Sequence, residues 1–189
     1  MECNSVTSAW RFAVDIYGRP GVREACLALQ DRRGADVVAM LVLLHGAARG
    51  HPAPSQEVLA AALAAVAPWR RSAVLALRAI RRDLKQWSFP EDIAPDCGAE
   101  RARQAVAAAE LAAERVELDY LARRLGTDSP GAGSGAPPTL AAATAVLALY
   151  GRAAALAFDA ADLKDLAILA AAALPDSPAG TAAPAGHGS

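Results

Sequence analysis

Lysine, aromatic residues and cysteine are scarce in this chain of 189 residues, and each shortage narrows what the protein can be. Aromatic residues make up only 5% of the chain although 54% of it is hydrophobic, because much of the apolar content is alanine. The core must therefore rest mainly on leucine, valine and isoleucine. Two lysines and 17 arginines nearly balance 20 acidic residues, so the net charge of −1 gives no overall attraction to nucleic acid or to an anionic membrane.

The cysteines and the N-terminus bear on the cellular compartment. Cys3, Cys26 and Cys97 form no CxxC pair and are odd in number, which favours a reducing environment. The first residues lack the basic and then apolar pattern of a secretory signal, so we expect a cytoplasmic protein. The most apolar stretch, 139–158, is mostly alanine and is interrupted by Arg152, so we expect no transmembrane segment.

The composition predicts an all-α fold. Alanine is the strongest helix former, runs of β-branched residues are few, and the length suits one domain. We therefore predict a single helical bundle of about six to eight helices. Its expected parts are a main helical domain over 1–126, a flexible linker over 127–138, a C-terminal helical hairpin over 139–174 that packs on or extends the bundle, and a disordered tail over 175–189.

Turn and cap residues place the helices. Pro20 predicts the start of a helix that Gly34 ends, and Asp36 is expected to cap the next one at a gain of about 1 kcal/mol. The run from Val37 to Leu44 is apolar on every side, which predicts a central buried helix. Pro68 predicts that one helix ends at 67 and another runs over 68–87, to lie antiparallel to a long helix over 98–125.

Patterns that carry catalysis or hold a metal are missing from the sequence. There is no HExxH motif, no glycine-rich phosphate loop and no GxSxG elbow. His45 and His51 are not spaced as metal ligands, and Cys26 lies on the expected inner face of its helix, where it acts as a small apolar residue. Asp159, Asp162 and Asp165 suit the start of a helix. We therefore predict no catalytic residue, metal or cofactor, and a protein that is not an enzyme.

Two complementary charged stripes are expected on the long helical pair. Basic residues occur at 70, 71, 78, 81, 82 and 85, and Glu110, Glu114 and Glu117 form an acidic stripe on the next helix. Such stripes either pair with one another and with solvent or track phosphates. No aromatic stacking platform accompanies the arginines, so the sequence gives no strong nucleic-acid signal.

A polar corner is expected at the turn between two helices, and its residues either cap those helices or face a partner. It consists of Gln30, Asp31, Arg32, Arg33, Gly34 and Asp36. We predict a non-enzymatic interaction or adaptor module for an unknown protein partner. Its candidate binding surface is Gln30, Asp31, Arg32, Arg33, Arg71, Arg78 and Arg82. The alternative is a bundle that binds or acts on an apolar, isoprenoid-like molecule, in a pocket lined by Trp10, Tyr17, Met40, Trp69 and Trp87. A seam of Leu111, Leu118, Leu121 and Leu125 packs internally or forms a homodimer through residues 98–125.

One stretch resembles a known family. From Tyr17 to Val37 the chain reads YxxPGVxxAxLxLQDxxGxDV, and the segments around Trp69 and Arg78 are similar to a second block. This pattern resembles a small uncharacterised proteobacterial family of helical proteins with a domain of unknown function, over roughly 8–125. The resemblance implies a cytoplasmic helical protein and no particular activity. Val38 stands where members of that family usually have asparagine.

Overall fold

A computed structural model describes residues 7–86, 97–129 and 137–175 of the chain. Its elements are α1 (Ser8–Tyr17), α2 (Val22–Arg33), α3 (Val37–Ala48), α4 (Gln56–Trp69), the π-helical segment η1 (Arg70–Leu75), α5 (Ala76–Gln86), α6 (Cys97–Arg124), α7 (Leu140–Ala153) and α8 (Ala160–Ala172). Because α4, η1 and α5 run on as one helix, the described part of the chain forms seven helices and no strand. The all-α prediction is confirmed.

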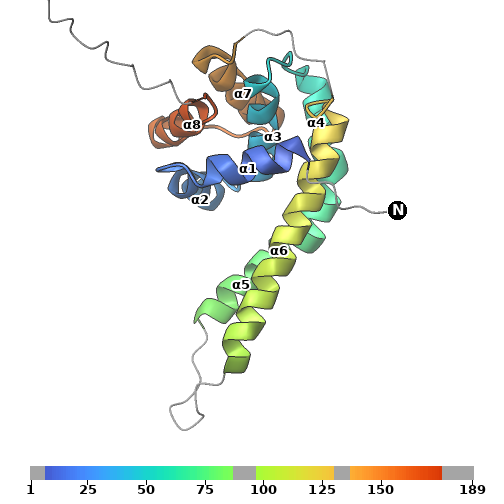
Figure 1. Cartoon of the computed structure of the whole chain (residues 1–189), viewed down its shortest axis with the longest axis vertical. Coiled ribbons are helices and arrows are strands. Elements are labelled where there is room, and N and C mark those ends of the chain that lie inside the picture. Colours follow the sequence, from blue (N-terminus) through green and yellow to red (C-terminus); the bar gives the residue numbers. More distant parts are fainter. Residues whose placement is uncertain (1–6, 87–96, 130–136, 176–189) are drawn as a thin grey trace, which may run out of the picture.

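Helix α3 lies at the centre of the body of the molecule, as its sequence predicts. Every residue from Ala39 to Ala47 is buried. The helix packs against α7, α6 and α1, while α2 packs against α8 on the outside (Figure 1). The C-terminal helices α7 and α8 thus cover α3 and α2.

The turn between α2 and α3 forms largely as its residues predict. Gly34 has a φ of 64°, a left-handed conformation that glycine adopts at little cost, and it ends α2. The Asp36 side chain accepts a hydrogen bond from the Ala39 N–H at 3.0 Å, which confirms the predicted cap. The start of α2 differs from the prediction, because Pro20 lies in a turn and the left-handed Gly21 (φ 77°) delays the helix to Val22.

The predicted break at Pro68 is wrong, because the helix continues through the proline. Pro68 has no N–H to donate, and the helix widens into the π-helical segment η1 two residues later. Packing holds this segment in place: η1 contacts α6, and the Trp69 Nε1–H donates a hydrogen bond to the Ala113 carbonyl at 3.0 Å. Tertiary contacts therefore outweigh the local preference for a break.

Helices α5 and α6 project from the body as a two-helix arm, which agrees with the predicted antiparallel pair (Figure 1). None of the residues of α5 is buried. On α6, Leu118 and Leu121 are buried where the helix crosses the body, but Leu111 is 52% exposed because it lies farther out. The predicted seam is thus only partly internal.

Two predictions about segments meet the structure only in part. Within the described residues, one helix, Gln56–Gln86, is long and apolar enough to cross a membrane by length and composition, and 22% of its most apolar window is buried. The stretch 139–158 instead divides into α7 and a turn.

The predicted flexible linker is partly ordered, because Thr127 is buried and the Asp128 side chain accepts a hydrogen bond from Ser8 at the start of α1. The rest of the linker over 130–136, Trp87 and the predicted tail from 176 lie outside the described residues.

Candidate functional site

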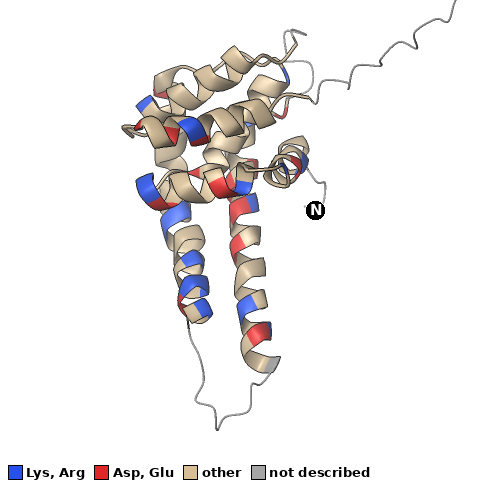
Figure 2. Ribbon diagram, turned by 90° about the vertical axis from the view of Figure 1, so that its left-hand side faces the viewer, with Lys and Arg blue, Asp and Glu red and all other residues tan. Residues whose placement is uncertain are grey.

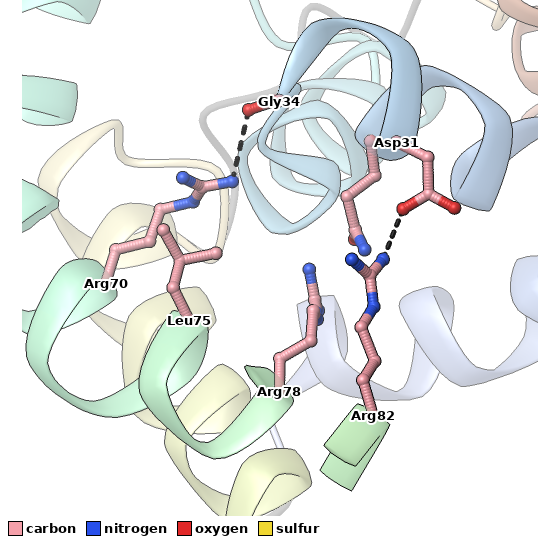
Figure 3. Close-up of a pocket in the computed structure, with 7 residues that line it drawn as sticks. Asp31, Gly34, Arg70, Leu75, Arg78 and Arg82 are labelled. Atoms are coloured by element: carbon pink, nitrogen blue, oxygen red, sulfur yellow. Dashed lines mark hydrogen bonds and ion pairs between the residues drawn. The ribbon is translucent and has the colours of Figure 1, made fainter. Parts of the chain in front are cut away.

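A cavity lies where the C-terminal end of α2 meets η1 and α5 (Figure 3). Its volume is about 160 Å³. Its lining consists of Gln30, Asp31, Gly34, Arg70, Leu75, Arg78 and Arg82. The fold therefore brings Gln30 and Asp31 of the predicted polar corner together with three arginines of the predicted basic stripe.

Arg70 joins η1 to the turn between α2 and α3. Its Nε lies 3.2 Å from the Asp36 carboxylate, and its Nη2 donates to the carbonyls of Gly34 and Ala35 at 3.4 and 3.2 Å. Sequence reasoning had placed Arg70 in the basic stripe without assigning it to the binding surface. These contacts fasten η1, and with it the start of α5, to the turn between α2 and α3.

Arg78 and Arg81 of α5 pair with the acidic stripe of α6. Figure 2 shows the acidic residues of α6 beside the basic residues of α5. The Arg78 Nε lies 2.9 Å from Glu110, its Nη2 lies 2.5 Å from Glu114, and the Arg81 Nε lies 2.5 Å from Glu110. Burial raises the pKa of Glu110, but the hydrogen bonds from Arg81 and Arg78 outweigh it and leave the pKa below its usual value. Arg82 pairs with Asp31 across the mouth of the cavity.

A buried carboxyl lies behind Arg70. The side chain of Glu117 is 0% exposed, its Oε1 lies 3.9 Å from the Arg70 Nε, and neither of its oxygens has a hydrogen-bond partner among the described residues. Burial and the neighbouring Asp36 raise the pKa of Glu117 to about 9, so this carboxyl is protonated at neutral pH. The Tyr150 hydroxyl accepts a hydrogen bond from the Asp36 N–H at 2.6 Å and completes the cluster.

Arg32 and Arg33 of the predicted corner point to α8 rather than into the cavity. Both pair with the fully buried carboxylate of Asp162, at 2.9 and 2.5 Å, and each reaches a second aspartate, Asp165 or Asp159. Burial alone would raise the pKa of Asp162, but the Asp159 N–H and the two arginines bring it to about 2. These arginines therefore fasten α2 to α8. Arg71, the remaining member of the predicted surface, is exposed and does not line the cavity.

An apolar groove lies between α4 and α6. It has a volume of about 170 Å³ and is lined by Ala65, Val66, Trp69, Val116 and Tyr120. Trp69 is 42% exposed and Val116 is 51% exposed. Between 105 and 113 on α6, every exposed residue is alanine or leucine, because the one charged residue, Glu110, is buried against α5. An apolar surface without charge thus continues from the groove along α6.

Of the described residues of the predicted apolar pocket, only Trp69 lines either of the two hollows described above. Met40 is fully buried in α3, Trp10 lies under the Arg115 guanidinium at 5.7 Å, and Trp69 lines the groove between α4 and α6. Tyr17 is half-buried, and Trp87 lies outside the described residues.

Sequence reasoning missed a polar cluster at the start of α1. The Ser8 hydroxyl donates to Asp128 and lies 3.1 Å from the His45 Nε2. Burial lowers the pKa of His45 to about 4, so its ring is neutral, and its Nδ1 has no partner among the described residues. No sequence signal pointed to the cluster, because Asp128 fell in the predicted linker. The contacts tie the start of α1 to the end of α3.

The described residues include no metal site, and the thiol of Cys26 is not an activated nucleophile. In the described ranges, no group of three or more His, Cys, Asp or Glu side chains is placed to hold a metal ion. Burial raises the pKa of the Cys26 thiol to about 12, so it is protonated at neutral pH and unreactive as a nucleophile.

Comparison with known proteins gives one match. The model of a protein family described as "protein of unknown function (DUF2390)" matches residues 8–121. No curated protein and no solved structure matches the chain. The match covers α1 to most of α6, and therefore includes the cavity and the groove.

Proposed function

Because the chain belongs to the DUF2390 family, whose description names no activity, we propose from its surface that it is a protein–protein interaction module rather than an enzyme. The docking face in this proposal is the apolar groove of α4 and α6 with the neighbouring exposed face of α6. The cytoplasmic location expected from the sequence and the proteobacterial origin implied by its family resemblance belong to the same proposal.

The uncovered apolar surface of α4 and α6 is the observation that supports this function. Trp69, Val116 and Leu111 all expose a large part of their apolar surface, and the exposed residues of α6 from 105 to 113 carry no charge. Contiguous exposed apolar surface costs free energy in water and is typical of a surface that a partner covers. Tryptophan and tyrosine also concentrate where binding energy concentrates, so Trp69 and Tyr120 are the expected anchors.

A second copy of the chain is the partner that the spacing on α6 favours. Ala102, Ala105, Ala109 and Ala112 are all exposed and recur at alternating intervals of three and four residues, followed by Val116. This is the spacing of a helix–helix seam, and small side chains allow two helices to approach closely. We therefore propose the homodimer through 98–125 with these small residues as its seam.

Sedimentation analysis of the full chain tests the homodimer. We expect Ala109→Glu to shift the wild-type dimer to a monomer, because the introduced carboxylate faces the seam. Ala141→Glu on α7 is the matched control, since Ala141 is also exposed and helical but lies away from the arm, and it should leave the dimer intact. A monomeric wild type, or equal effects of both variants, argues against self-association.

Site-specific photo-crosslinking in the native host tests the docking face itself. A benzophenone amino acid in place of Val116 should form discrete adducts with a partner or a second copy, whereas the same residue in place of Ala141 should form none. Absence of adducts from position 116 at normal expression would contradict the proposal.

A further inference from the structure

The three arginines of the cavity retain unused hydrogen-bond donors. Arg70 and Arg78 each use Nε and Nη2 on partners within the chain, and Arg82 uses Nη2 on Asp31. Within residues 7–86, 97–129 and 137–175, no hydrogen-bond partner is found for the Nη1 group of any of the three. Each Nη1 group carries two N–H bonds. Figure 3 shows the three guanidinium groups rising from η1 and α5 toward the end of α2, around the cavity.

The lining of the cavity itself is more basic than acidic. Three arginines line it with a single carboxylate, Asp31. Behind them, Asp36 lies 3.2 Å from Arg70, and Glu110 and Glu114 lie 2.9 and 2.5 Å from Arg78, so these carboxylates offset much of this charge and the unused Nη1 donors are what the cavity offers to an anion. Glu117 offsets little of it, because burial keeps this carboxyl protonated at neutral pH.

We propose that this cavity binds an oxyanion group, a carboxylate or a phosphate, carried by a small ligand. The planar guanidinium matches either group, which accepts two parallel hydrogen bonds from it. A volume of about 160 Å³ equals the share of about five liquid waters, enough for one such group and a few further atoms. The cavity uses none of the residues of the groove between α4 and α6, so this inference does not depend on the proposed docking face.

Calorimetric titration of the full chain with sodium succinate and, separately, with inorganic phosphate tests the proposal. Sodium chloride holds the ionic strength constant and serves as the reference anion. Wild-type protein should show saturable binding of at least one of the two anions. Saturation by succinate alone identifies a carboxylate site, by phosphate alone a phosphate site, and by both a general oxyanion site.

Three variants make the test specific. Arg82→Gln should weaken binding about tenfold, the size of one lost charge-assisted interaction, and its half-exposed position lets the fold tolerate it. Asp31→Asn removes the single carboxylate of the lining, frees the donors of Arg82, and should tighten binding about threefold. Arg71→Gln is the matched control, because Arg71 is a neighbouring exposed arginine of η1 outside the cavity, and it should leave the affinity unchanged.

The same titrations can overturn the proposal. It fails if neither anion saturates the wild-type protein, or if Arg71→Gln weakens binding as much as Arg82→Gln, which would indicate a diffuse charge effect. It also fails if Asp31→Asn does not tighten binding. Circular dichroism on each variant confirms that the helical fold is retained, and Asp31→Asn gives a test by gain that loss of folding cannot imitate.

Discussion

Replacing the buried Glu117 by glutamine should stabilise the protein, and more so as the pH rises. The folded protein keeps this carboxyl protonated up to a pH of about 9, whereas an unfolded chain releases the proton near its ordinary pKa of 4.5. Unfolding between these two values therefore releases a proton, and the stability of the wild type falls with increasing pH. Glutamine has almost the same shape and never ionises, so Glu117→Gln removes this dependence.

The size of the effect follows from the shift in pKa. Each pH unit above the unfolded value corresponds to about 1.4 kcal/mol. At pH 7, which is 2.5 units above 4.5, the variant should be more stable than wild type by about 3 kcal/mol. The two proteins should have nearly equal stability at pH 4.5. The gain should grow up to the folded pKa and then level off.

Urea unfolding followed by circular dichroism at pH 5, 6, 7 and 8 measures this difference. Glu24→Gln, on the exposed surface of α2, is the control and should change the free energy of unfolding by less than about 0.5 kcal/mol. The alternative is that Glu117 is ionised and paired with Arg70. Removing one partner of a buried ion pair costs about 3–5 kcal/mol, so a destabilised Glu117→Gln at pH 7 would refute the reasoning.

Three further substitutions test the contacts around the same turn, each by urea unfolding. Tyr150→Phe should cost about 1–3 kcal/mol, because the buried N–H of Asp36 loses its acceptor; no change would show that another acceptor replaces it. Asp162→Asn should cost about 3 kcal/mol at pH 7, and the deficit should fade as the pH falls from 3.8 to 2, where the wild-type carboxylate is itself protonated; a deficit constant down to pH 2 would contradict this. Gly34→Ala should cost about 1 kcal/mol, from the left-handed backbone alone, since an added Cβ meets nothing within 4 Å; asparagine there should cost less.

Features set by residues close in the sequence were predictable. Gly34 and Asp36 act within four residues of their own position, so the end of α2 and the start of α3 follow from local chemistry. The burial of α3 follows from an apolar run that no exposed helix tolerates. The acidic stripe of α6 was expected to complement the basic one, and Arg78 does pair with Glu110 and Glu114.

Features set by distant parts of the chain were not predictable. The partners of Arg32 and Arg33 lie on α8, about 130 residues later, so nothing within the corner itself indicates that these side chains are paired. The cavity depends on the angle at which η1 meets the end of α2, which no periodicity encodes. Pro68 usually marks the start of a new helix, whereas here the packing of Trp69 on α6 keeps the helix continuous.

The π-helical segment η1 changes the direction in which the side chains after it point from the long helix. A π turn contains about one residue more than an α turn, so everything after it is rotated by about 100° relative to an uninterrupted α-helix. Leu59, Ala62 and Val66 before the segment face the body, and Arg78 and Arg82 after it face the end of α2. The number of residues in η1, more than their identity, therefore determines the side of the helix on which Arg78 and Arg82 lie. Deleting one residue between Arg71 and Val74 would turn Arg78 and Arg82 around the arm and away from the cavity, although every residue that lines the cavity would still be present.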